Sequence, residues 1–140
     1  MKHVVIAFIL LCVLSIGGCK SSGNPEAEKV AVQAAQDWLA LVDAGQYAQS
    51  WDEVAEYFKN AVAQDKWIEM VWGVRNPLGA MKTREVKSSR YTTSVPGAPD
   101  GEYVIIQFNT SFENKQSAVE TVTPMSQKDG NWGVSGYYIK

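Results

Sequence analysis

Residues 103–112 read YVIIQFNTSF, and the prediction of a sheet starts from this segment. Apolar side chains at positions 104, 106, 108 and 112 alternate with polar ones at 107, 109 and 111, which is typical of a strand with one buried face. Residues 118–125, rich in threonine and valine, follow a short connection and are the expected antiparallel partner. Asp129-Gly130 is a hairpin turn signal, so residues 132–139 are predicted to form the final strand.

Upstream of residue 103 the pattern predicts one more strand and three helices. Residues 84–95 are the expected first strand, followed by a long turn over residues 96–101. A helix is expected around residues 66–73, ended by the Asn76–Gly79 segment with its proline and glycine. A capping box from Ser50 to Glu53 predicts the start of the helix before it.

The first helix has a clear start and end. Asn24-Pro25-Glu26 combines an N-cap, a proline at the first helical position and an acid near the positive end of the dipole. Gly45 is the expected C-terminal cap. The apolar face of this helix is predicted from the spacing of Val30, Ala34, Trp38, Leu41 and Val42.

Helices followed by strands indicate the α+β class: N-terminal helices packed on a curved antiparallel sheet of about four strands. This order, with residues 37–47, 50–52 and 58–59, resembles the cone-shaped fold of nuclear transport factor 2 and ketosteroid isomerase. The resemblance implies a pocket between helices and sheet. It brings no catalytic residue, because no tyrosine–aspartate pair here matches the one in the isomerases.

Four segments also resemble a family of bacterial lipoproteins catalogued as domain of unknown function 4019. They are residues 51–59, 75–79, 99–108 and 134–138. This second resemblance implies the fold and a location outside the cytoplasm, and it supplies no activity.

The N-terminus has the pattern of a lipoprotein leader. A short basic start precedes an apolar run over residues 4–16, which is too short to span a bilayer. Ile16-Gly17-Gly18-Cys19 then resembles the lipobox, where bacterial lipoproteins receive lipid on the cysteine. An ordinary secretory leader cut elsewhere is the alternative. The expected division is residues 1–18 as signal peptide, 19–25 as lipidated cysteine and short tether, and 26–140 as one domain.

Lipid on Cys19 makes the membrane the first expected partner, with an unknown envelope protein or a small ligand as the second. Because Lys20 rather than an aspartate follows, the expected location is the cell envelope, lipid-anchored, and the outer membrane facing the periplasm in a Gram-negative bacterium. A net charge of −2 over 140 residues argues against nucleic-acid binding.

Cysteine and histidine are too few for several kinds of active site. The two cysteines are Cys12 and Cys19, and the one histidine is His3. The predicted domain therefore has no disulfide, no thiol nucleophile, no Ser-His-Asp arrangement and no imidazole-bound zinc. We expect no cofactor and no metal, and we assign no catalytic residue.

The candidate ligand-binding residues are aromatic or basic. The aromatic ones either line a concave pocket or fill the core: Trp51, Tyr57, Tyr103 and Tyr138. Lys82, Arg84 and Arg90 alternate along the expected first strand, either as an anion site or as a solvated face. Only Val86 is apolar among the even positions from 82 to 90, so we expect these cations to point outward.

Two functions fit these patterns. The first is a non-enzymatic binding or scaffolding module anchored in the envelope. The alternative is an isomerase or hydratase that works in the cone pocket without histidine or metal. A deep, open pocket with a titratable group favours the enzyme, and a cone filled by tryptophan favours the binding module.

Overall fold

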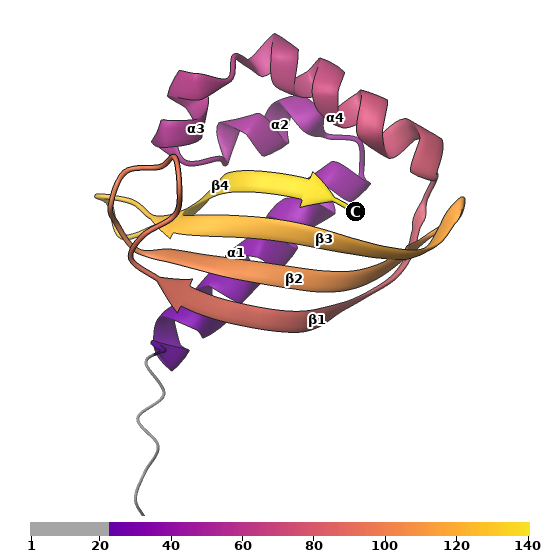
Figure 1. Cartoon of the computed structure of the whole chain (residues 1–140). Helices are drawn as coiled ribbons and strands as arrows, with labels where there is room; N and C mark the ends of the chain where they lie inside the picture. The colour runs from indigo at the N-terminus through magenta and orange to yellow at the C-terminus, as the bar shows by residue number, and fades with distance from the viewer. Residues whose placement is uncertain (1–22) are drawn as a thin grey trace, which may run out of the picture.

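The computed structural model describes residues 23–140, so the predicted leader and the lipidation site Cys19 lie outside the described residues. The described chain forms helices first and strands second, which confirms the α+β class (Figure 1). The helices are α1 (Pro25–Asp43), α2 (Tyr47–Asp52), α3 (Glu56–Ala61) and α4 (Gln64–Leu78). The strands are β1 (Met81–Thr92), β2 (Tyr103–Phe112), β3 (Lys115–Ser126) and β4 (Trp132–Ile139).

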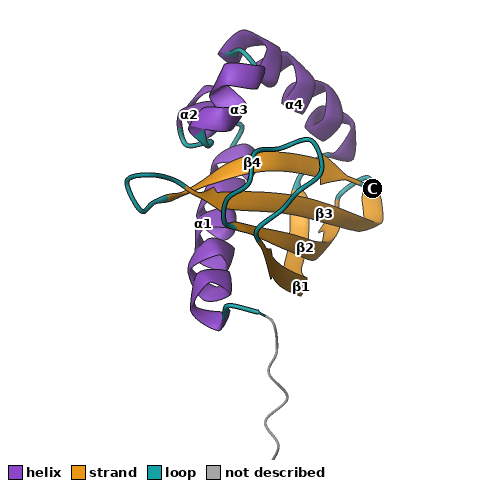
Figure 2. Cartoon of the chain, turned by 60° about the vertical axis from the view of Figure 1, so that its left-hand side comes forward, coloured by secondary structure: helices purple, strands orange, loops and turns teal. Residues whose placement is uncertain are grey.

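The strands form an antiparallel sheet in the order β1-β2-β3-β4, each paired with its neighbour in sequence. The alternation that predicts β2 is confirmed, since Val104, Ile106 and Phe108 are all buried. Helix α1 crosses one face of the sheet, while α2, α3 and α4 gather on the β4 side (Figure 2).

Helix α1 starts and ends as predicted. The Asn24 side chain accepts a hydrogen bond from the Ala27 N–H over 3.1 Å, and Gly45 follows the helix with a φ of 74°. Its buried face is rotated from the predicted one, however. The buried residues of the helix are Ala27, Ala31, Ala35, Trp38, Leu39 and Val42. Small alanine side chains let the helix lie close to the strands, and Val30 is left 44% exposed.

The predicted capping box at Ser50 is wrong. Ser50 lies inside α2, where its hydroxyl donates to the Tyr47 carbonyl over 2.7 Å and accepts from the Trp67 indole N–H over 2.9 Å. Helix α3 starts separately, at Glu56. The tertiary contact with Trp67 uses the hydroxyl that the local pattern assigns to a cap.

Helix α4 is longer than predicted. It begins at Gln64 and includes Pro77 in its last turn, where the missing N–H removes a single hydrogen bond, to the carbonyl four residues earlier. Gly79, with a φ of 72°, takes the chain out of the helix in a conformation that other residues rarely adopt.

Aromatic side chains fill the space between helices and sheet. Trp38 lies 5.8 Å from Trp67 and 5.2 Å from Tyr137, measured between ring centroids, and Phe58 packs edge-on against Trp67. The core cluster runs from Ala31 to Val134, so the described segment contains its own hydrophobic core.

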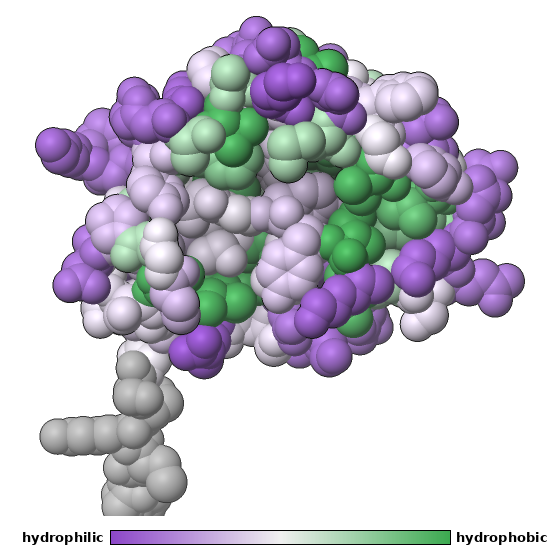
Figure 3. Space-filling view, turned by 45° about the horizontal axis from the view of Figure 1, so that its top comes forward, coloured by the Kyte–Doolittle hydropathy of each residue, from purple (hydrophilic) through white to green (hydrophobic). Residues whose placement is uncertain are grey.

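Some apolar side chains stay at the surface. Figure 3 looks toward the helical side and shows hydrophobic patches among hydrophilic side chains. Met70, Trp72 and Val74 of α4 are each at least half exposed. Among residues 23–140, no helix combines the length and the apolar character that crossing a bilayer requires.

Candidate functional site

Two arginines and two carboxylates from four elements meet inside the domain. This buried ion cluster consists of Asp43 at the end of α1, Arg75 of α4, Arg84 of β1 and Glu120 of β3. Arg84 joins the two carboxylates, because its Nε donates to Glu120 Oε1 over 2.7 Å and its Nη1 donates to Asp43 Oδ2 over 2.6 Å. Arg75 Nη2 donates to Asp43 Oδ1 over 2.8 Å. Two charges of each sign therefore compensate one another.

Glu120 has no exposed surface, and the other groups that donate hydrogen bonds to it lie on neighbouring strands of the sheet. Thr110 donates to Oε1 over 2.6 Å, and the Tyr137 hydroxyl donates to Oε2 over 2.5 Å. Burial and the neighbouring Glu120 carboxylate raise the pKa of Tyr137, so its hydroxyl keeps the proton that it donates. A ligand outside the domain cannot touch Glu120, which distinguishes it from an acid/base group in an open pocket.

Asp43 forms the outer part of the cluster, with its side chain 19% exposed. Burial raises its pKa, but hydrogen bonds from Arg84 and Arg75 outweigh this and hold the pKa below its ordinary value. Burial in turn lowers the pKa of Arg84, and its bonds to Asp43 and Glu120 more than reverse this. The Arg75 guanidinium also lies 4.9 Å from the centre of the Phe112 ring.

Sequence reasoning missed three members of this cluster: Asp43, Arg75 and Glu120. For Glu120 a signal was present, because it shares its strand face with Ala118 and Val122, and a lone charge on a buried face requires a partner. Asp43 and Arg75 lie at helix ends, where charges are usually solvated, and no local pattern distinguishes them.

The prediction that Lys82, Arg84 and Arg90 point outward together is wrong. The Arg84 side chain is 10% exposed and turns into the ion cluster, whereas Lys82 and Arg90 are exposed. The β1–β2 register shifts near Lys82 and again between Val86 and Ser88. Each shift inserts a residue and reverses which face the following side chains take, so alternation counted along the sequence fails.

The four aromatic candidates do not converge on one pocket. Tyr57 and Tyr103 donate to the carbonyls of Gly97 and Pro99, so both hydroxyls hold the turn after β1. The Trp51 indole donates to the Val62 carbonyl over 2.8 Å. Tyr138 is half exposed on β4.

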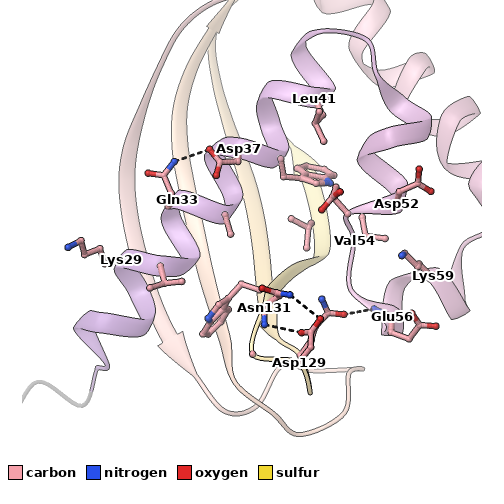
Figure 4. A pocket seen from close by; sticks show the side chains of 18 of the residues that line it. Lys29, Gln33, Asp37, Leu41, Asp52, Val54, Glu56, Lys59, Asp129 and Asn131 are labelled. Carbon is pink, nitrogen blue, oxygen red and sulfur yellow. Dashed lines mark hydrogen bonds between the residues drawn. The ribbon is translucent and has the colours of Figure 1, made fainter.

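The surface carries a long cavity, which we name the trough, with a volume of about 1040 Å³. One wall is a single stripe of α1, and the other is the segment from Asp52 to Lys59; the β3–β4 turn closes one end (Figure 4). The α1 stripe includes Glu26, Lys29, Val30, Gln33, Asp37 and Leu41. Buried Trp38 and Val134 contribute to the floor.

The trough is acidic. Six carboxylates and two lysines line it, which leaves a net charge of −4. Within residues 23–140 none of the six forms an ion pair with a lysine or arginine. Asp37 accepts from the Gln33 amide over 2.9 Å, and the backbone and side-chain amides of Asn131 lower the pKa of Asp129. In the described part of the chain, no group of three or more acidic, histidine or cysteine side chains is arranged to hold a metal ion.

No curated protein matches this sequence significantly. The model of a family described as a protein of unknown function (DUF4019) matches residues 34–137. The match starts within α1 and ends in β4, and it includes the whole ion cluster and Tyr137. The N-terminal part of the trough, from Glu26 to Gln33, precedes it. Since most of its length is matched, the chain belongs to the DUF4019 family.

Proposed function

We propose that this protein is a lipid-anchored, non-catalytic binding module of the bacterial cell envelope, and that it binds its partner in the trough. Helices followed by a curved meander sheet also support the cone-shaped fold of nuclear transport factor 2 as the finer description of the domain.

The observation that carries the proposal is a contrast between the interior and the trough. In the interior, each oxygen of Asp43 and Glu120 already accepts a hydrogen bond, and Trp38 and Trp67 pack against each other between the helices and the sheet. In the trough, carboxylates lie beside apolar surface without ion-pair partners from residues 23–140. Buried carboxylates paired with arginine are suited to hold a fold, and exposed carboxylates without an ion-pair partner are suited to bind.

The anchor rests on the lipobox at residues 16–19. The N-cap Asn24 is the fifth residue after Cys19, a span of at most about 17 Å when extended. Glu26 and Lys29 of the trough follow within the first turns of α1, so an anchor on Cys19 holds that end of the trough close to the membrane.

Photo-crosslinking in bacterial cells tests binding without assuming what the partner is. A photoreactive amino acid replaces Gln33, an exposed residue in the trough, and in a control protein it replaces Lys87, exposed on β1. We expect a discrete crosslinked product at position 33 and none at position 87. Equal products, or none at either position, contradict binding in the trough.

Mass spectrometry tests the anchor separately. The mature protein is expected to begin at a diacylglyceryl-modified Cys19, and Cys19→Ser is expected to leave soluble or unprocessed protein. An unmodified N-terminus at another residue contradicts the anchor.

A further inference from the structure

Helix α1 presents a second apolar stripe that the domain itself does not cover. Its alanine face packs on the sheet, while Val30, Ala34 and Leu41 turn toward the trough. Val30 is 44% exposed, and Leu41 and Ala34 are only half-buried. An amphipathic helix normally buries one stripe, so a second, partly exposed stripe provides apolar contact area for a partner.

The charges around this stripe indicate the sign of the partner. Asp37 lies on the α1 wall, with Asp52 and Glu56 on the opposite wall (Figure 4). These three side chains are exposed, and none forms an ion pair within residues 23–140. With the two lysines counted, the lining of the trough keeps a net negative charge, which favours a cationic occupant over an anionic one such as an acidic lipid surface.

The length of the trough indicates the shape of the partner. From Glu26 to Leu41 the α1 wall rises about 22 Å, at about 1.5 Å per helical residue. An extended chain of about seven residues covers that distance at about 3.3 Å per residue. Its side chains alternate, so one set reaches the apolar floor while the other lies between the acidic walls.

We propose that the trough is a docking site for an extended, basic segment of another envelope polypeptide, with apolar and cationic side chains in alternation. This inference rests on the proposed function and specifies the partner's chemistry.

Peptide titration of residues 20–140, which include the complete core, tests it. The probe is a blocked heptapeptide of alternating lysine and leucine, and binding is followed by calorimetry. We expect saturable one-to-one binding that weakens about tenfold or more between 50 and 200 mM salt, because the attraction is between exposed charges. A peptide with glutamate in place of lysine should not bind, and serine in place of leucine should weaken binding.

Matched variants locate the site. Asp37→Asn, Asp52→Asn and Glu56→Gln together should weaken peptide binding at least tenfold. Asp65→Asn, Glu85→Gln and Asp100→Asn together make the same change in charge outside the trough and should leave binding within about twofold, since distant exposed charges are screened. Equal weakening by both triples would mean that net charge alone attracts the peptide, and would overturn the proposal.

A second pair tests the apolar stripe. Val30→Ser should weaken binding several-fold, while Val86→Ser, at 43% exposure on β1, should not. Binding of a polyamine but not of the peptide would overturn the polypeptide occupant. A crosslinked product at Gln33 without peptide binding would retain the proposed function and reject this inference.

Discussion

Glu120 lies on β3 without exposed surface and accepts hydrogen bonds from Arg84, Thr110 and Tyr137. A buried carboxylate is costly unless its oxygens are paired, so each of these donors offsets part of the cost of removing Glu120 from water. The hydroxyls of Thr110 and Tyr137 are therefore expected to contribute to stability, although no local sequence pattern assigns them a role.

Tyr137→Phe removes one of these donors and preserves the ring that packs on Trp38. We expect the free energy of unfolding to fall by about 1–3 kcal/mol, because one oxygen of buried Glu120 loses its hydrogen bond. Tyr138→Phe, at the next position but half exposed, is the control and should change stability by less than about 0.5 kcal/mol. Urea unfolding of both variants decides this, and equal effects would contradict the role given to Tyr137.

The low pKa of Asp43 predicts how stability depends on pH. A group whose pKa is lowered on folding stabilises the protein above its unfolded-state value, here about 3.8, and this contribution is lost as pH falls through the lower folded-state pKa. Asp43→Asn should therefore be less stable than wild type at pH 7 and lose less stability on further acidification. Asp100→Asn, in an exposed turn, should follow the wild-type curve. Denaturant unfolding at several pH values gives the free energy of unfolding of each variant as a function of pH. If this free energy falls equally in wild type and Asp43→Asn as pH is lowered, the coupling of Asp43 to Arg84 and Arg75 is refuted.

At the scale of the elements, β4 is the last strand of the sheet, and another segment of the chain packs closely along its outer edge. The link between α2 and α3 runs along it, with a parallel bridge between Val54 and Val134 and a hydrogen bond from the Ala55 N–H to the Val134 carbonyl. Gly133 makes this approach possible, because a Cβ there would lie 2.8 Å from the backbone nitrogen of Ala55. Asp52 and Glu56, the helix residues on either side of this link, lie on the wall of the trough.

Gly133→Ala is expected to destabilise the domain by about 1–3 kcal/mol, because neither backbone can move away without losing the bridge. Gly136→Ala on the same strand is the control, since its Cβ would meet only the Thr123 Cβ at 4.0 Å, an ordinary contact. Thermal unfolding of the two variants should therefore separate them clearly. A neutral Gly133→Ala would mean that the link moves freely away from β4.

At the scale of the whole molecule, residues 20–140 contain no cysteine and no histidine, so neither a disulfide nor a thiolate- or imidazole-bound metal can support this part of the chain. We therefore predict that thermal unfolding of residues 20–140 is unchanged by reductant and by a chelator. A shift of several degrees with the chelator would reveal a carboxylate metal site that supports the fold.

Local sequence patterns predict the fold class and most element positions, because alternation in β2, the Asp129-Gly130 turn and the Asn24-Pro25 start depend on nearby residues. Those signals are local, and tertiary contacts reinforce them. Local reasoning failed at Ser50, whose hydroxyl bonds a distant indole, and along β1, where register shifts reverse the facing of Arg84.

Tertiary contacts determine which charges are paired in the interior and which stay exposed. Asp43 and Glu120 are far apart in sequence and meet through Arg84, while Asp37 and Asp52 remain in the open trough. Which face of α1 is buried also depends on tertiary packing. The alanine face of the helix is buried, and the face with Val30 is left partly exposed. Burial of a charge or of a helix face depends on what packs against it, and that is a property of distant segments.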